Sequence, residues 1–416
     1  MKNKIHTPEG VRDVYGRECD RKNFLEGEIE ALFHSYGYQS IDTPTFEFFD
    51  VFAKEVGTIP SRELYKFFDR EGNTLVLRPD FTPPVARAVS MYFQDEDMPI
   101  RLCYKGNIYI NSLEHQGRLK ESTQAGVELI NDSSMEADGE ILALVIQCMK
   151  RAGLSEFQVS VGSVDFFNAL TKEAGMDEET ITSLKTLLSM QNRFGAQELI
   201  EGLNLRKDLR DLFVRLPELF GDASVLDEAE GLTTNTRARA ALERLKEIYG
   251  ILDTYGFRNY LVFDLSMVTK YQYYTGIIFQ AYTYGSGDAV IKGGRYDTLL
   301  ERFGKKASAI GFAVQTDDLL TAIERSHISL PVYDSKTMVL YPADLENLAI
   351  RFSNEKRAEG LEIACVRFRE GHVLDDYRVY GQRNQFGGII YFRSADEVYS
   401  INLSNGQTVR IPIHFS

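Results

Sequence analysis

Residues 101–130 read RLCYKGNIYINSLEHQGRLKESTQAGVELI, and the rest of the chain is organised around this stretch. The β-rich beginning, RLCYKGNIYI, predicts one strand, the turn-forming NSLEHQG predicts a loop, and TQAGVELI predicts a second strand. Because side chains alternate between the two faces of a strand, Gln124, Gly126 and Glu128 share one face. That face therefore carries an amide and a carboxylate with a glycine between them.

Two interpretations of this polar face remain open. A buried polar group without a partner costs roughly 1–3 kcal/mol, so Gln124 and Glu128 on an inner face would need a polar ligand to meet them. A small zwitterionic or cationic molecule would satisfy both. Alternatively, the strand lies at the edge of a sheet and its polar face is simply hydrated.

Length and composition limit the class of protein. A chain of 416 residues with 44% hydrophobic and 26% charged residues predicts a globular protein of two or three domains. The first residues, MKNKIHTPEG, lack the apolar core of a signal peptide, and no apolar run approaches the roughly 18 residues of a membrane span. We therefore expect a cytoplasmic protein without a membrane partner.

Charge and cysteine content argue against two further classes. The net charge of −14 disfavours a broad nucleic-acid surface, because phosphate contacts need clustered Lys and Arg. The four cysteines, at positions 19, 103, 148 and 365, form no Cys-x-x-Cys pair, and the six histidines are dispersed. We expect no metal and no cofactor.

The segment RPDFTPPVAR presents two polar side chains before the central stretch. Three prolines between Pro79 and Pro84 argue against a regular helix or strand and predict a rigid loop that displays Asp80 and Thr82. Asp80 could be a turn former only, or it could face a ligand. Upstream, a helix is expected from about residue 19 to 34, followed by a strand that Pro44 restricts to an edge or an interface.

The remaining pattern predicts an α+β fold with a separate last domain. A helix over 135–152 and a helical region over 164–255 precede the β-rich runs of 258–315, which predict an antiparallel sheet and a helix from about Tyr296. If the YQYYTGIIF run is a regular strand, Tyr273 and Tyr274 point to opposite faces. Residues 333–416 alternate five strands with one helix, over about 345–359, which indicates an α/β domain.

Several of these motifs resemble one protein family. The GN…GRLKESTQAGVE arrangement is similar to the second signature motif of class II aminoacyl-tRNA synthetases in its histidyl version, and YYTG and GGRYD resemble the histidine-specific signatures. RPDFT, with aspartate, resembles more closely the paralogue that serves as regulatory subunit of ATP phosphoribosyltransferase. The resemblance covers roughly 7–323. It implies a class II synthetase-like antiparallel sheet flanked by helices, with domains over 1–328, including a helical insertion at about 165–256, and over 331–416.

The resemblance also implies a histidine-binding site. Asp80, Thr82 and Gln124 would hold the α-ammonium group of histidine. Glu128, with Tyr273 or Tyr274, would fix the imidazole through charge-assisted and hydroxyl hydrogen bonds.

The arginines of the active synthetase are absent from the matching positions. The arginine that contacts the α-phosphate falls at Ile110, the one beside the reacting carboxylate at Thr269, and the one that packs on adenine at Asp318. An acidic partner falls at Ser112, and only Arg118 of the GRLK loop remains. Since losing one such donor typically costs about 10²- to 10³-fold in rate, we expect no amino-acid activation.

The resemblance thus implies a non-catalytic regulatory subunit of ATP phosphoribosyltransferase, in the first step of histidine biosynthesis. Its partner would be the short-form catalytic subunit, which joins ATP to phosphoribosyl pyrophosphate, and histidine would be the effector. The proline of motif 1, here Pro44, implies a homodimer within a hetero-oligomer, and no tRNA partner is expected. The alternatives are an active histidyl-tRNA synthetase, a free-standing histidine-sensing dimer, and an inherited pocket that binds nothing.

Overall fold

The computed structural model describes residues 6–53, 59–111, 119–269, 271, 273–332 and 336–412. The chain divides into two compact units. The first comprises 1–13 and 25–330, and the second comprises 14–24 and 331–416. The domain limits expected from the sequence, 1–328 and 331–416, stay a prediction.

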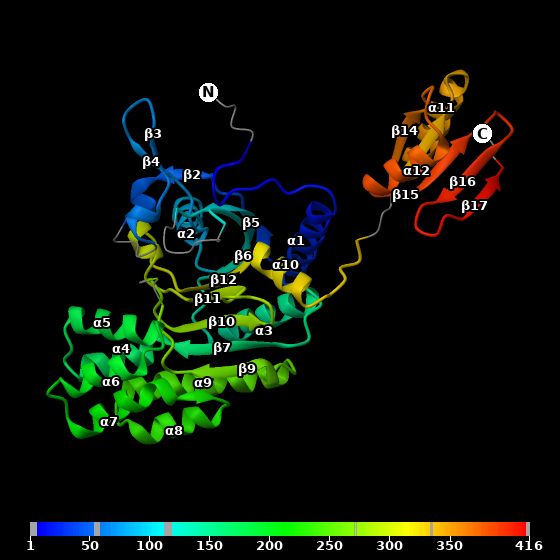
Figure 1. The fold of residues 1–416 in the computed structure, drawn as a ribbon. Coiled ribbons are helices and arrows are strands. Elements are labelled where there is room, and N and C mark those ends of the chain that lie inside the picture. Colours follow the sequence, from blue (N-terminus) through cyan, green and yellow to red (C-terminus); the bar gives the residue numbers. More distant parts are fainter. Residues whose placement is uncertain are drawn as a thin grey trace. The chain divides into compact units, whose positions relative to one another are not determined.

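A mixed sheet of nine strands within the described residues forms the centre of the first unit (Figure 1). Most neighbouring strands are antiparallel, while the pairs β1–β5 and β7–β9 are parallel. In order across the sheet, the strands are β1 (Gln39–Ser40), β5 (Ile100–Tyr109), β6 (Glu121–Ile130), β12 (Ala309–Gln315), β11 (Ile291–Arg295), β10 (Ile277–Thr283), β7 (Phe157–Ser163), β9 (Leu261–Asp264) and β8 (Phe220–Gly221).

The expected β5–β6 hairpin is present, and β6 lies inside the sheet. Ile100 pairs with Ile130 at one end of the hairpin and Tyr109 with Glu121 at the other, and β12 pairs with the opposite side of β6. Every residue of β6 from Thr123 to Ile130 is buried. The hydrated edge strand is therefore the wrong alternative, because both faces of β6 are covered.

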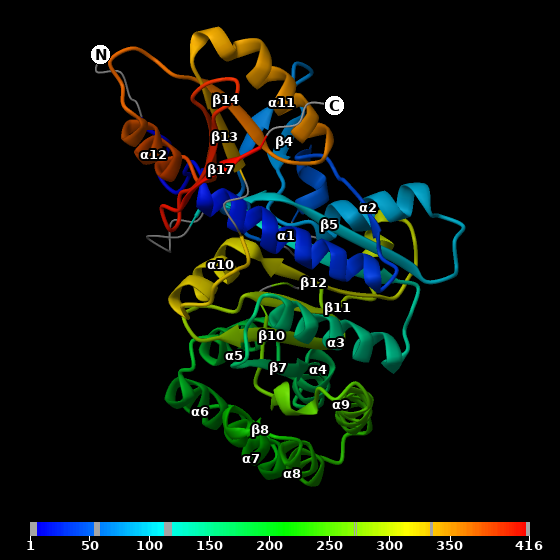
Figure 2. The same ribbon diagram turned by 90° about the vertical axis from the view of Figure 1, so that its right-hand side faces the viewer.

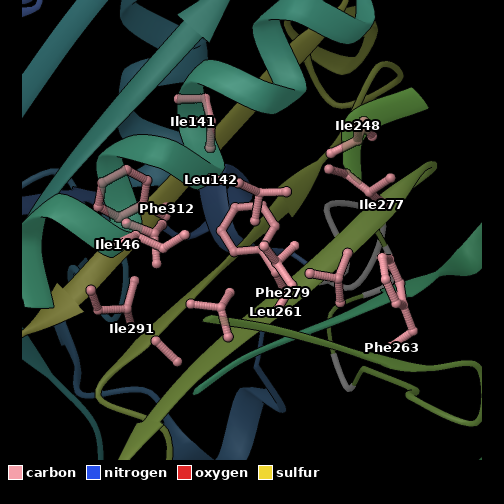
Figure 3. Close-up of a cluster of buried hydrophobic side chains, with 14 of the residues drawn as sticks. Ile141, Leu142, Ile146, Ile248, Leu261, Phe263, Ile277, Phe279, Ile291 and Phe312 are labelled. Atoms are coloured by element: carbon pink, nitrogen blue, oxygen red, sulfur yellow. The ribbon is translucent and has the colours of Figure 1, made fainter. Parts of the chain in front are cut away.

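Helices cover one face of this sheet (Figure 2). They are α1 (Arg17–Ser35), α3 (Met135–Arg151) and α10 (Thr316–Arg325). In Figure 3 the side chains of Ile141, Leu142 and Ile146 from α3 face the sheet residues Phe279 and Phe312. All five belong to the largest buried apolar cluster. This packing gives the main sheet its rigidity.

A run of helices follows β7, and most of them begin at a residue whose side chain caps the helix. Ser163, Asp177, Asn192 and Asn235 each accept hydrogen bonds from backbone N–H groups of the first turn. The helices are α4 (Val164–Glu173), α5 (Glu178–Ser189), α6 (Arg193–Glu201), α7 (Lys207–Arg215), α8 (Ser224–Leu232) and α9 (Thr236–Thr254). Figure 1 shows them gathered near β7 and β9, toward one end of the sheet.

A smaller sheet and α2 correct the expectation for the proline-rich segment. The small sheet has the order β2 (Phe46–Phe48), β4 (Thr74–Leu77) and β3 (Lys66–Phe68), and Pro44 lies between β1 and β2. Helix α2 (Thr82–Tyr92) contains Pro83 and Pro84 in its first turn. The prediction that the prolines exclude a helix was wrong, because N–H groups of the first helical turn have no intrahelical acceptor and proline is tolerated there.

The tyrosine segment and the residues after β11 also differ from expectation. Strand β10 begins only at Ile277, so Tyr273 and Tyr274 precede it in an irregular segment and the alternation argument does not apply to them. The helix expected from Tyr296 is one short 3₁₀ helix. The 3₁₀ helices of the described residues are η1 (Phe49–Phe52), η3 (Ser61–Glu63), η4 (Leu216–Glu218), η5 (Arg258–Tyr260), η6 (Leu300–Phe303) and η7 (Ala343–Leu345).

The second unit is an α/β domain, as predicted. Its strands are β14 (Ile363–Arg367), β13 (Lys336–Tyr341), β15 (Phe386–Phe392), β16 (Val398–Asn402) and β17 (Thr408–Ile411). Helix α11 (Glu346–Ala358) belongs to one buried cluster of this unit and α12 (Leu374–Arg383) to another. The sequence analysis missed α12, a short helix whose Asp376 carboxylate accepts the Val373 N–H across its start.

The α+β fold expected from the sequence is present, with a largely antiparallel sheet flanked by helices and a separate C-terminal unit. Among the helices of the described residues, none combines the length and the apolar character that crossing a bilayer requires.

Candidate functional site

Glu128 is the centre of a buried polar cluster on β6. Its side chain is 1% exposed. The hydroxyl of Thr82, at the start of α2, donates to Glu128 Oε1 at 2.8 Å, and the hydroxyl of Tyr296, just after β11, donates to Oε2. Three segments that are far apart in the sequence therefore meet at one carboxylate.

Glycines make the space that this carboxylate occupies. Gly311 of β12 pairs directly with Glu128, and Gly294 of β11 pairs with Gly311. A Cβ atom at position 311 would lie 1.8 Å from Glu128 Oε2, and one at position 294 would lie 2.8 Å from the ring of Tyr274. These two glycines on neighbouring strands are thus a requirement of the site, because a larger residue at either position would displace its side chains.

Asp80 forms a second buried carboxylate beside the first. Its Oδ1 accepts the N–H of Phe81 at 2.8 Å, and the hydroxyl of Tyr273 donates to Oδ2 at 3.3 Å. Burial raises the pKa of Asp80, and the N–H groups of Phe81 and Thr82 oppose the rise.

Tyrosine rings enclose the two carboxylates. The ring of Tyr273 lies 4.7 Å from that of Tyr274 and 5.8 Å from that of Tyr296. The ring of Tyr104, on β5, stacks on Phe81 at 4.4 Å. Burial raises the pKa of Tyr104, Tyr273, Tyr274 and Tyr296 well above the ordinary value, so all four hydroxyls stay protonated and can donate hydrogen bonds.

Gln124 lies on the same face of β6 as Glu128, as the alternation predicted. Its side chain is buried, and within the part of the chain that the structure describes its Oε1 has no hydrogen-bond partner. A buried acceptor without a partner is costly, so a hydrogen-bond donor carried by a ligand would stabilise Gln124 here.

The structure pairs the six expected residues differently from the sequence-based assignment. Thr82, expected on the ammonium side with Asp80, bonds to Glu128, and Tyr273 bonds to Asp80 rather than to Glu128. Sequence reasoning missed Tyr296, although it lies within the quoted GGRYD motif. Tyr104, opposite Gly126 on β5, was missed as well.

The three positions that lack arginine carry an aliphatic, a hydroxyl and an acidic side chain. Ile110, after β5, packs against the buried cluster that contains Tyr104, Tyr273 and Tyr296. The hydroxyl of Thr269 accepts the N–H of Tyr271 at 3.1 Å. Asp318 is exposed in the first turn of α10. Ser112 and Arg118 lie outside the described residues.

Burial raises the pKa of Glu128 to about 8, and the charge of Asp80 adds to the rise, whereas the hydrogen bonds from Tyr296 and Thr82 oppose it. A carboxyl with a raised pKa in the folded state favours folding in its protonated form, so its contribution to stability falls as pH rises from about 4.5 to about 8. Glu128→Gln, which stays neutral, should therefore gain stability relative to the parent chain as pH increases. Urea unfolding of both proteins at pH 5, 7 and 9 measures this, and a difference independent of pH would contradict it.

The contacts of the described residues make this cluster a candidate site for a small cationic or zwitterionic ligand. Within the described ranges, no three histidine, cysteine, aspartate or glutamate side chains gather as metal ligands would. A separate hollow of about 250 Å³ between α1 and β5, lined among others by Phe33 and Lys105, contains neither carboxylate of the cluster.

Comparisons with known proteins show which family the chain resembles. A family model described as histidyl-tRNA synthetase matches residues 10–319. The chain is 37% identical over 410 residues to an ATP phosphoribosyltransferase regulatory subunit of Acetivibrio thermocellus, covering 99% of this chain and 98% of the relative.

Two solved structures share the fold. A crystal structure titled ATP phosphoribosyltransferase regulatory subunit/histidyl-tRNA synthetase, from Bacillus halodurans C, has a TM-score of 0.83 and 34% identity, covering 93% of this chain and 98% of that one. A histidyl-tRNA synthetase from Nostoc sp. PCC 7120 has a TM-score of 0.82 at 16% identity, covering 99% and 97%, and shows the fold alone. The chain belongs to the family of ATP phosphoribosyltransferase regulatory subunits, built on the histidyl-tRNA synthetase fold.

Proposed function

We propose that this chain is the non-catalytic regulatory subunit of an ATP phosphoribosyltransferase. It assembles with a short-form catalytic subunit, enables the activity of that subunit, and carries the feedback inhibition by histidine. The relatives that bear this name match over nearly the full length of the chain, which supports the assignment.

The observation that carries the proposal is the contrast between the two sides of the site. The amino-acid side keeps two buried carboxylates, Asp80 and Glu128, within a shell of tyrosines. On the side where a synthetase holds ATP, this chain has Ile110 and Asp318 in place of arginines. Activation of an amino acid concentrates negative charge on phosphate and needs fixed cations there, so this chain binds histidine without activating it.

Histidine has the groups that the buried cluster requires. Its α-ammonium would lie next to Asp80 and Gln124, whose Oε1 is an acceptor without a partner among the described residues. Its imidazole would lie between Glu128 and Tyr273 or Tyr274, where a ring nitrogen can donate to the carboxylate. A cationic imidazole next to Glu128 would lower the pKa of this carboxyl again and favour its ionised form. A charge-assisted hydrogen bond to a buried group contributes about 1.5–3 kcal/mol, so loss of this bond should weaken affinity strongly.

Inhibition follows from linkage between two binding events. If histidine binds the inhibited arrangement of the hetero-oligomer more tightly than the active one, by typically 1–3 kcal/mol, its binding shifts the population toward the inhibited form.

The small sheet supports the homodimer that we propose within the hetero-oligomer. Phe46 and Phe48 of β2 and Phe67 of β3 share one face, because they pair with Leu77 and Leu75 of β4. The three phenylalanines are 51%, 56% and 37% exposed. A second copy of the chain would cover this apolar face.

Replacing Phe46 and Phe67 by serine should weaken the dimer by at least about 100-fold, since each buried phenylalanine contributes roughly 1.5–3 kcal/mol. Sedimentation at graded concentrations measures the dissociation constant. Phe68→Ser is the matched control, because Phe68 is also exposed but lies on the opposite face of β3. Equal effects of the two changes would rule out this face as the interface.

The proposed function is tested by mixing the purified chain with a short-form catalytic subunit and following turnover with and without histidine. We expect the mixture to be active and histidine to suppress it, and Glu128→Gln to raise the histidine concentration for half-suppression by about 10- to 100-fold. Glu121→Gln is the control on the same strand, because Glu121 bonds to Asn107 instead of the cluster.

Two results would overturn the proposal. One is a mixture that forms no complex and shows no activity. The other is histidine-dependent exchange of pyrophosphate into ATP by the chain alone, which would identify an active synthetase.

A further inference from the structure

Asp138, on α3, is a fully buried carboxylate that joins two arginines from different parts of the chain. Its Oδ1 accepts hydrogen bonds from Nε, at 2.8 Å, and Nη2, at 2.5 Å, of Arg295, which ends β11 and is 3% exposed. Its Oδ2 accepts Nε of Arg244 on α9 at 2.6 Å. Burial raises the pKa of Asp138, and the two guanidinium groups oppose the rise, so the charged carboxylate depends on both arginines.

Both arginines also hold the turn that follows β6. Arg295 Nη1 donates to the carbonyl of Asp132 at 2.9 Å, and Arg244 Nη2 donates to those of Ser133 and Ser134 at 3.0 and 3.2 Å. This turn directly follows the strand that carries Glu128. The network therefore fixes one end of that strand.

The same arginine anchors the tyrosine segments of the site. The backbone carbonyl of Arg295 accepts the N–H of Thr275 at 2.8 Å, and the N–H of Asp297 donates to the hydroxyl of Thr275 at 3.0 Å. Tyr274 precedes Thr275 and Tyr296 follows Arg295. The buried ion network is thus connected, through Arg295 and Thr275, to the backbone next to two tyrosines that contact the carboxylate cluster.

Helix α9 packs closely against α3, and this close packing holds Arg244 of α9 in place. A Cβ atom at Gly139 of α3 would lie 2.5 Å from Ile251 of α9, so only glycine permits this approach. Arg244 is partly exposed and could extend into water, yet its guanidinium bonds to Asp138 and to two carbonyls.

We propose that Arg244 and Asp138 are positioning residues for the tyrosine side of the ligand site, and that helix α9 is coupled through them to whatever the site binds. The network acts on Tyr296 and Tyr274 through Arg295 and Thr275 and touches no ligand itself. The inference rests on the proposed function for the identity of the ligand, histidine, while the effect on the tyrosine segments is a property of the chain alone. A movement of α9 against α3 then changes the affinity for histidine, and histidine binding resists that movement.

The test compares Arg244→Gln with Arg244→Lys in the full-length chain. Arg237→Gln is the matched control, because Arg237 lies on the same helix and pairs with exposed Asp165 instead. We expect Arg244→Gln to weaken histidine binding in calorimetric titration by about 10-fold, Arg244→Lys to recover part of the loss, and the control to change affinity less than about 2-fold.

A double-mutant cycle separates positioning from a general loss of structure. The effect of Arg244→Gln should shrink when Tyr296 is already phenylalanine, because the hydroxyl that the network aligns is gone, and should persist fully in an Asp80→Asn background. Equal effects in the two backgrounds would overturn the proposal.

A second readout needs no ligand. Amide hydrogen exchange of peptides that cover 273–278 should accelerate in Arg244→Gln and not in the control. Unchanged exchange would overturn the coupling whether or not histidine binds. Absence of histidine binding by the parent chain, with accelerated exchange in the variant, would instead overturn the proposed function alone.

Discussion

Asp138→Ala is expected to lower the free energy of unfolding by about 3–5 kcal/mol, which would be a large part of the stability of a typical domain. The loss arises because Arg295 is 3% exposed, so its guanidinium would remain buried without a counter-charge. Arg244 is more exposed and can reach water. Urea unfolding of the full-length chain, followed by far-ultraviolet circular dichroism, measures the shift.

The matched control is Asp165→Ala, which also removes an aspartate from an arginine of α9. That pair is exposed on both sides, at 39% and 60%, and exposed pairs contribute about 0–1 kcal/mol. Asp138→Asn should lie between the two, because an amide oxygen still accepts one hydrogen bond. A loss at Asp138 no larger than that at Asp165 would show that Arg295 finds other partners.

Gly311→Ala is expected to disrupt the site and destabilise the chain together. The new Cβ atom would lie 1.8 Å from Glu128 Oε2 and 2.4 Å from the carbonyl oxygen of Val127. The side chain can turn away, but the carbonyl belongs to the neighbouring strand and cannot move without breaking the β6–β12 pairing. Overpacking costs typically about 1–3 kcal/mol, and the contact with backbone places this change at or above the upper end.

The second expected consequence of Gly311→Ala is a loss of affinity for histidine. Displacement of the Glu128 carboxylate separates it from Tyr296 and Thr82, so we expect affinity to fall by at least about 100-fold. Gly250→Ala on α9 is the control, because nothing lies within 4 Å of its added Cβ atom and alanine favours a helix by about 0.5–1 kcal/mol. Full stability and full affinity of Gly311→Ala would contradict the geometry.

Local patterns predicted the elements that depend on near neighbours in the chain. Alternation in TQAGVELI placed Gln124 and Glu128 on one face, and the helical region after β7 followed from its amphipathic pattern and its few β-branched residues. The errors occurred where context overrides a local rule. Pro83 and Pro84 were expected to prevent a helix, but they occupy the first turn of α2. Tyr273 and Tyr274 were expected within a strand, but they precede β10.

The sequence by itself determined which chemical groups are present. It showed that Asp80, Thr82, Gln124, Glu128 and the tyrosine pair are available, and that Ile110, Thr269 and Asp318 are not arginine. The residue types alone decide which charges are available, because no fold can give an isoleucine a positive charge.

Only the tertiary structure decided how these groups behave. The need for glycine at 311 and the hydroxyl of Tyr296 at the Glu128 carboxylate involve residues more than 160 positions apart along the chain. The raised pKa of Glu128 comes from its burial among several separate segments. Likewise, Asp138 and Arg295 are separated by 157 positions, and no local pattern pairs them. Burial and the energy of an ion pair depend on what surrounds a group in space, and that surrounding exists only once the strands and helices have packed.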